Sequence, residues 1–189
     1  MKIMNPTSNK SDFEDLTTNL KDLAYSYLEK YNPSKQQLKI YLLKKYLTKI
    51  KGTKSKKEVT SIIDEIVVNL EKNKILSDEL YSDSKARMYL RRGYSLNKIN
   101  QSLRSKGIDE KFVKQSLEKI KENQIEPDFV SALKLCKRRR IGPVRPENNR
   151  ELFYKKDMGI LARGGFSFDL SKRVLDLDVK EFNKLIRLI

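Results

Sequence analysis

Residues 91–120 predict two short amphipathic helices that meet at a glycine. Ser95 is placed to cap the first helix, and Gly107 can adopt the left-handed conformation that ends it. Asp109 can then cap the second helix. The apolar residues of the two helices recur at helical spacing, and they are Leu96, Ile99, Leu103, Phe112, Val113, Leu117 and Ile120. Because neither short helix can bury its apolar stripe alone, the pair requires neighbouring helices.

The same turn recurs further along the chain. One constant offset in residue number relates the two copies. The matching residues are Leu103, Gly107, Ile108, Asp109, Phe112 and Leu117 in the first copy and Leu161, Gly165, Phe166, Ser167, Leu170 and Leu175 in the second. Repetition of this kind indicates small modules that stack on one another, because each module buries its apolar face against the next.

Helix-start signals divide the rest of the chain. In a capping box, a serine is followed three residues later by Glu or Gln, and this pattern predicts helix starts at Ser11, Ser34 and Ser55. Between the second and third helices, residues 49–57 form a lysine-rich loop. Residues 143–155 are polar and begin after a Gly-Pro pair, so we expect a looser segment there.

We therefore predict an all-α fold, an elongated array of three tandem three-helix repeats that resemble helix-turn-helix units. A flexible tail of residues 1–11 comes first. The repeats span residues 12–77, 78–126 and 127–189, and the last of them includes an additional C-terminal helix. The free protein is expected to be a monomer, because the sequence contains no heptad run that would form a dimer seam.

The chain is strongly basic. It contains 41 Lys and Arg against 25 Asp and Glu, which gives a formal net charge of +16 and a pI of about 9.8. This balance favours a polyanion or an acidic protein surface as the partner, although it also promotes solubility alone. No apolar run is long enough to span a bilayer, and the first residues lack a hydrophobic signal core, so we expect a cytoplasmic location without a membrane partner.

The residues that carry most enzyme chemistry are missing from the sequence. There is no His, which is the commonest general base and metal ligand, and one Cys cannot form a zinc site by itself. Gly52 lacks the upstream glycine of a phosphate-binding loop. Cys136 lies on the apolar stripe of a predicted helix, where a small buried side chain is the better interpretation. We predict a protein that is not an enzyme and has no catalytic residue, cofactor or metal.

Arginine is confined to the later part of the chain, at and after Arg87. Arg suits bidentate contacts with phosphate or carboxylate. Clusters of cations near the ends of predicted helices in the second and third repeats suggest a basic strip that contacts a charged polymer. The candidate contact residues are Arg87, Arg91, Arg92, Lys98, Arg104, Lys106, Arg138, Arg139 and Arg140. The alternative is that each of them is only a solvated charge or a partner of a helix dipole.

Three stretches resemble the RecX family of bacterial recombination regulators. One stretch resembles the middle repeat of that family. It reads RRGYSLNKINQSLRSKGID, with ILSDELYSDSKARMYL before it and FVKQSLEKI after it. A second stretch, LARGGFSFDLSKRVL, resembles the signature of the family's third repeat. A third stretch, LAYSYLEKYNPSKQQLKIYLLKKYL, is similar to the family's first repeat. The resemblance covers roughly residues 16–178 and departs from the family at Ser77 and Asp78, where two acids are common.

The resemblance implies a fold of tandem three-helix repeats and a protein that regulates RecA in homologous recombination, DNA repair and the SOS response. Family members bind in the groove of the RecA filament on single-stranded DNA and modulate, usually by inhibition, filament extension, ATP hydrolysis and strand exchange. By position, the contacts are expected at Arg91, Arg92, Lys98, Arg104 and Lys106, with residues 138–140 second. Direct contact with DNA is compatible with this assignment.

A second hypothesis belongs to another class of function. Residues 95–120, with Gly107 in the turn, could form a helix-turn-helix unit that binds duplex DNA directly as a transcriptional or architectural factor. Such a protein would recognise a particular duplex sequence. This hypothesis leaves the threefold repetition unexplained.

Overall fold

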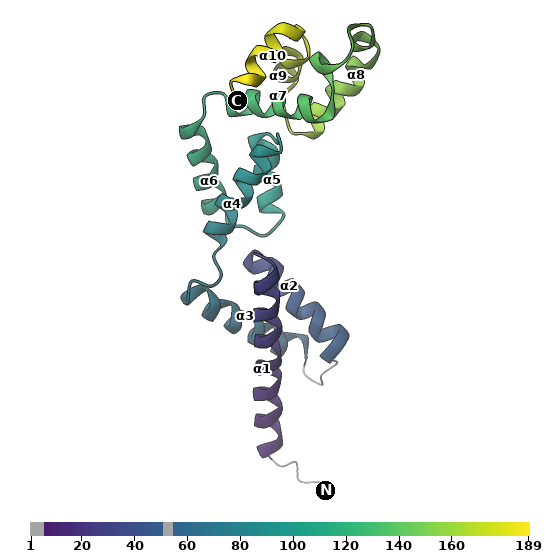
Figure 1. Cartoon of the computed structure of the whole chain (residues 1–189). Coiled ribbons are helices and arrows are strands. Elements are labelled where there is room, and N and C mark those ends of the chain that lie inside the picture. The colour runs from purple at the N-terminus through teal and green to yellow at the C-terminus, as the bar shows by residue number, and fades with distance from the viewer. Residues whose placement is uncertain (1–5, 51–54) are drawn as a thin grey trace. The chain divides into compact units, whose positions relative to one another are not determined.

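The computed structural model describes residues 6–50 and 55–189, in which all regular secondary structure is helical (Figure 1). The α helices are α1 (Pro6–Lys30), α2 (Lys35–Lys45), α3 (Lys56–Lys72), α4 (Asp78–Arg91), α5 (Leu96–Arg104), α6 (Glu110–Asn123), α7 (Pro127–Arg139), α8 (Glu147–Arg163), α9 (Phe168–Leu175) and α10 (Val179–Arg187). A π-helical turn, η1 (Tyr46–Ile50), follows α2, and a 3-10 turn, η2 (Gly142–Val144), follows α7. The predicted all-α fold class is confirmed.

The chain forms two compact units. The first contains the residues up to Tyr81 together with Lys106–Ile108, and the second contains Ser82–Ser105 and Asp109–Ile189. The division falls within α4, so it does not follow the repeat boundaries expected from the sequence, which stay a prediction. No helix in residues 6–50 and 55–189 is long and apolar enough to cross a membrane.

In the first unit, α1, α2 and α3 pack on one another around a single apolar core. The core residues are Leu16, Leu20, Ala24, Leu38, Leu42, Tyr46, Val59, Ile62, Ile63, Ile66, Val67, Leu70 and Leu76. Along α3 they recur every three or four residues, which is the period of one helix face. The predicted capping boxes at Ser34 and Ser55 are both formed, so the starts of α2 and α3 are confirmed.

The predicted start of the first helix is wrong. α1 begins at Pro6, so Ser11 lies inside the helix, and residues 6–11, which the sequence predicts to be a tail, are helical. Proline is well suited to a first helical turn, because its missing N–H would have no partner there. Residues 51–54, the centre of the predicted lysine-rich loop, lie outside the described residues.

The second unit contains α5 to α10 and most of α4. The core between α7, α8, α9 and α10 is built from Phe129, Ala132, Leu133, Leu135, Cys136, Ile141, Leu161, Phe166, Val174, Leu175, Leu177 and Phe182. The stripe residues Ile99, Leu103, Val113 and Ile120 of α5 and α6 are also buried, as their helical spacing predicts.

Residues 143–155 are ordered around one buried carboxylate, whereas the sequence suggested a looser stretch. Asp157 is 1% exposed and accepts hydrogen bonds from Arg145 Nε at 2.6 Å, from Arg145 Nη2 at 2.7 Å and from the backbone N–H of Gly142 at 2.9 Å. The hydrogen bonds that Arg145 donates to Asp157, together with the negative charge of Asp157, raise the pKa of the Arg145 guanidinium against the effect of burial. Arg150 Nη2 donates to the carbonyl of Pro143 at 2.6 Å. These bonds fix η2 and the residue after it against α8.

A hydrogen-bonding motif in the first unit joins the start of α2 to residues much later in the chain. The hydroxyl of Ser34 donates to the carbonyl oxygen of Lys106 at 2.7 Å. The backbone N–H of Lys35 donates to Asp78 Oδ1 at 2.9 Å. Because the first N–H groups of a helix have no partner within the helix, Asp78 satisfies a group that would otherwise lack one.

An equivalent motif occurs in the second unit at the start of α5. The backbone N–H of Ser95 donates to the carbonyl oxygen of Gly164 at 3.2 Å. The backbone N–H of Leu96 donates to Asp128 Oδ1 at 2.7 Å. In both motifs, an aspartate at the start of a later helix caps an earlier one, and the carbonyl precedes a glycine with positive φ, Gly107 or Gly165. The internal repeat of the sequence is therefore also a repeat of tertiary contacts.

The single cysteine, Cys136, is expected to be unreactive in the folded protein. It is fully buried, and burial, with a smaller contribution from the charge of Asp157, raises the pKa of its thiol to about 12. Since the thiolate is the reactive form, 5,5′-dithiobis(2-nitrobenzoic acid) at mildly alkaline pH should label one thiol in urea and almost none in native buffer. Rapid labelling of the native protein would contradict the buried position.

Candidate functional site

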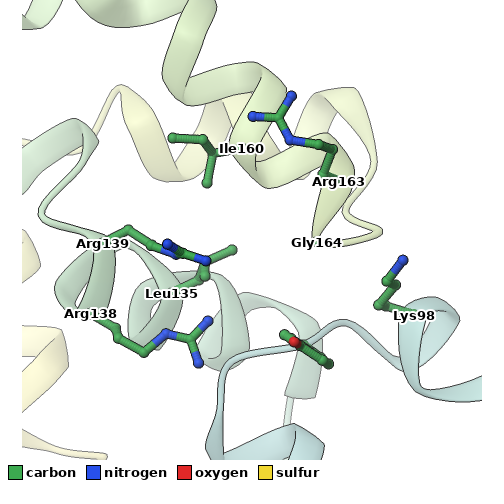
Figure 2. A pocket seen from close by; sticks show the side chains of 8 residues that line it. Lys98, Leu135, Arg138, Arg139, Ile160, Arg163 and Gly164 are labelled. Carbon is green, nitrogen blue, oxygen red and sulfur yellow. The ribbon is translucent and has the colours of Figure 1, made fainter. Parts of the chain in front are cut away.

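A cationic pocket lies within the second unit, where the first turn of α5 approaches the last turns of α7 and α8 (Figure 2). Its volume is about 380 Å³. It is lined by Tyr94, Lys98, Leu135, Arg138, Arg139, Ile160, Arg163 and Gly164. Four of these side chains are positively charged, and we call Lys98, Arg138, Arg139 and Arg163 the pocket cations. No acidic side chain lines the pocket.

Helix ends position the pocket cations. Lys98 lies in the first turn of α5, where its backbone N–H donates to the hydroxyl of the N-cap residue Ser95 at 3.1 Å. Arg138 and Arg139 occupy the last turn of α7, and Arg163 is the last residue of α8. Figure 2 shows Lys98 and the Arg138–Arg139 pair on opposite sides of the pocket, with Arg163 and Ile160 along a third side. Cations at helix C-termini also interact favourably with the helix dipole, so local structure tolerates them there.

The pocket cations have no acidic partner in the described part of the chain. Other arginines do, since Arg104 pairs with Glu110 at 2.9 Å and Arg173 pairs with Glu126 at 2.7 Å. Unpaired charges of one sign around a hollow repel one another and concentrate positive potential in it. An anion that enters the pocket relieves this repulsion, so the site is suited to binding an anion.

The remaining predicted contact residues lie elsewhere. Arg91 and Arg92 are exposed at the end of α4, and Arg140 caps α7 in a left-handed conformation with φ of 54°. None of the three lines the pocket. Arg104 is engaged by Glu110, and Lys106 belongs to the first unit. The role of all of these residues as contacts stays a prediction.

Arg87 lines a separate hollow of about 300 Å³ in the second unit, together with Asp83 and Lys119. Burial acts to raise the pKa of Asp83, but hydrogen bonds from Lys119 and Ser116 and the charges of Lys119 and Arg87 outweigh it and lower that pKa. The charge of Arg87 therefore stabilises the ionised carboxylate of Asp83, whereas the pocket cations have no such acidic neighbour among the described residues.

Of the residues that line the pocket, Lys98, Arg138 and Arg139 are among the contacts predicted from the sequence, whereas Arg163 and Tyr94 are not. Arg163 precedes a Gly-Gly pair, and a basic residue followed by glycine is also the ordinary pattern of a helix C-terminus. The ring of Tyr94 is stacked on Tyr89 with centroids 5.4 Å apart, and the guanidinium of Arg138 lies 6.0 Å from its centroid. The sequence did contain a signal for Arg163. In both copies of the repeated turn, an arginine lies shortly before the glycine: Arg104 before Gly107, and Arg163 before Gly165.

The charged groups that line the pocket are suited to binding an anion. Guanidinium and ammonium groups donate hydrogen bonds and accept none. Across residues 6–50 and 55–189, no three His, Cys, Asp or Glu side chains are grouped in a way that could hold a metal ion.

Comparison with known proteins identifies relatives along most of the chain. A family profile described as RecX, second three-helix domain, matches residues 77–117. Regulatory protein RecX of Myxococcus xanthus (strain DK1622) is 33% identical over 161 residues, which cover 84% of this chain and 85% of that protein. Regulatory protein RecX of Corynebacterium efficiens is 30% identical over 131 residues, which cover 65% of this chain and 61% of that protein.

Two solved structures share the fold. The crystal structure of RecX from Lactobacillus salivarius has a TM-score of 0.59 at 17% identity and covers 93% of this chain and 99% of that one. A crystal structure of regulatory protein RecX matches with a TM-score of 0.62 at 21% identity, and the match covers 94% of this chain and 80% of that one. These two likenesses support the helical repeat architecture. Given the 33% identity to a relative over most of both chains, this protein belongs to the RecX family of regulatory proteins.

Proposed function

We propose that this protein binds RecA and RecA filaments on single-stranded DNA, and that it inhibits filament extension, ATP hydrolysis and strand exchange. Membership in a family of regulatory proteins named RecX carries this proposal. The cationic pocket supports it, because the filament presents polyanionic DNA. Tyr94 and Lys98, which line the pocket, lie within the segment that the family profile matches. The protein would act by binding and not as an enzyme.

The proposed function is tested by ATP hydrolysis of the cognate RecA on single-stranded DNA. With this protein titrated in at one moderate salt concentration, we expect inhibition at well below one molecule per RecA, because one bound regulator that blocks extension affects many protomers. Salt must be held constant, since a protein of net charge +16 also coats DNA nonspecifically, and that coating weakens steeply as salt rises.

A control separates regulation from coating of the DNA. An unrelated basic protein of similar size and charge should inhibit only near saturation of the strand. Absence of inhibition by our protein at excess, combined with tight binding to one particular duplex sequence, would contradict the proposal. That result would favour the hypothesis of a helix-turn-helix protein that binds DNA directly.

A further inference from the structure

A ligand that matches the cationic pocket would carry more than one negative charge or be part of a charged polymer. Four cations surround a hollow of about 380 Å³, and no acid lines it. A single carboxylate would neutralise one of the four. Three of the four are arginines, whose planar guanidinium groups match phosphate oxygens in a bidentate geometry. Phosphate groups therefore suit the charged side of the pocket.

A matching ligand would also offer an apolar or flat surface. Tyr94, Leu135 and Ile160 line the pocket together with the cations. An acidic peptide side chain would leave these apolar groups without a partner, whereas a nucleotide has a flat base and a sugar besides its phosphate. Bases stack on aromatic side chains and arginines without regard to sequence. The volume is in the range of sites that hold one small molecule, so it suits one nucleotide rather than the side of a duplex.

The walls of the pocket are held in place by the tertiary contacts at the start of α5. The carbonyl of Gly164, a lining residue, accepts from the N–H of Ser95. Gly165 has φ of +87°, and a side chain there would collide with the hydroxyl of Ser95 and with Lys98. The first turn of α5, which carries Lys98, is therefore in direct contact with the Gly164–Gly165 turn that follows Arg163. A site built before the ligand arrives loses less conformational freedom on binding.

We propose that the cationic pocket binds a nucleotide of single-stranded DNA, with the backbone phosphates on Arg138, Arg139 and Arg163 and the base or sugar against Tyr94. This inference rests on the proposed function and deepens it, because it assigns the pocket to the DNA of the filament and not to acidic side chains of RecA. Lys98 contributes from α5 on the opposite side, so the bound strand lies between α5 and the ends of α7 and α8.

The test measures binding of a fluorescently labelled oligothymidylate to the full-length protein by anisotropy over a series of salt concentrations. The test variant is R138A/R139A/R163A, and the matched control is K155A/K180A/K184A, which removes the same charge from exposed positions of the same unit outside the pocket. For single strands, a plot of the logarithm of the binding constant against the logarithm of the salt concentration has a negative slope, whose magnitude is about 0.7 per neutralised phosphate. We expect the test variant to bind at least tenfold more weakly and to lose about 2 from the magnitude of that slope.

The control variant is expected to keep most of the slope and the affinity. Equal losses in the two triple variants would overturn the inference, because they would show that net charge alone governs binding. Unlabelled oligothymidylate should displace the probe far better than ATP at equal nucleotide concentration. Displacement by ATP at lower concentration than by the oligonucleotide would also overturn it, in favour of a site for free nucleoside triphosphates.

Failure of this inference can be told apart from failure of the proposed function. If the test variant binds oligothymidylate as wild type does but no longer inhibits RecA, the pocket contacts RecA itself, and only the inference about DNA is overturned. If wild-type protein has no effect on RecA while its binding to oligothymidylate depends on the pocket cations, the proposed function fails and the DNA site stands.

Discussion

Replacing Asp157 with alanine is expected to lower the free energy of unfolding of the second unit by about 3–5 kcal/mol. The side chain is 1% exposed and holds Arg145 through two hydrogen bonds of 2.6 and 2.7 Å, besides the N–H of Gly142. Removing the carboxylate leaves a largely buried guanidinium and a buried backbone N–H without acceptors, so their desolvation is no longer offset. Urea denaturation followed by far-UV circular dichroism measures the loss.

An exposed ion pair in the same unit provides the control. Lys172 Nζ lies 2.7 Å from Asp176 Oδ2, which is as close as Arg145 lies to Asp157, but both of these side chains face water. Lys172→Ala should leave the unfolding midpoint almost unchanged, because solvent screens such pairs. A midpoint for Asp157→Ala no lower than that of Lys172→Ala would show that the Asp157 network does not hold residues 143–155 in place.

Replacing Gly93 with alanine is expected to cost about 2–5 kcal/mol, from two independent sources. Gly93 has φ of +71°, a conformation that L residues with a side chain rarely adopt. A methyl group there would also lie 2.7 Å from the carbonyl oxygen of Ser131 and 2.8 Å from the backbone nitrogen of Leu135. Both atoms belong to the backbone of α7, so the helix itself would have to move. The unfolding midpoint in urea should fall by a corresponding amount.

Gly159 offers the matched comparison. It lies inside α8, and a methyl group there would meet only Arg163 Nη1, at the ordinary distance of 3.5 Å. Gly159→Ala should raise stability by up to about 1 kcal/mol, because alanine is the better helix former. If Gly93→Ala and Gly159→Ala proved equally stable, the close approach of residue 93 to α7 would not exist in solution.

Local patterns predicted most of the fold. The period of the apolar residues located α3, α5 and α6, and serines followed by Glu or Gln located the starts of α2 and α3. Helix caps and amphipathic stripes depend on residues within a few positions of one another, so they can be read without knowledge of the fold. The start of α1 at Pro6 was missed because an internal Ser-Glu pair looked like a cap.

The candidate site was predicted only in part. Lys98, Arg138 and Arg139 were expected as contacts because they are basic residues near helix ends. Their grouping with Arg163 in one pocket depends on how α5, α7 and α8 pack, and residues far apart in the chain carry no local signal of that packing. Arg104 looked equally suitable in the sequence, but in the structure it is paired with Glu110.

The sequence by itself determined the helical class, the repeated turn at Gly107 and Gly165 and the resemblance to the RecX family, because each follows from local residue order. Only the tertiary structure decided which charges have partners. It buried Asp157 against Arg145 and left the four pocket cations without an acid. The physical reason is that a charge is neutralised by an opposite charge within about 4 Å of it. Helix packing decides which charges come that close, and the two residues are rarely adjacent in the sequence.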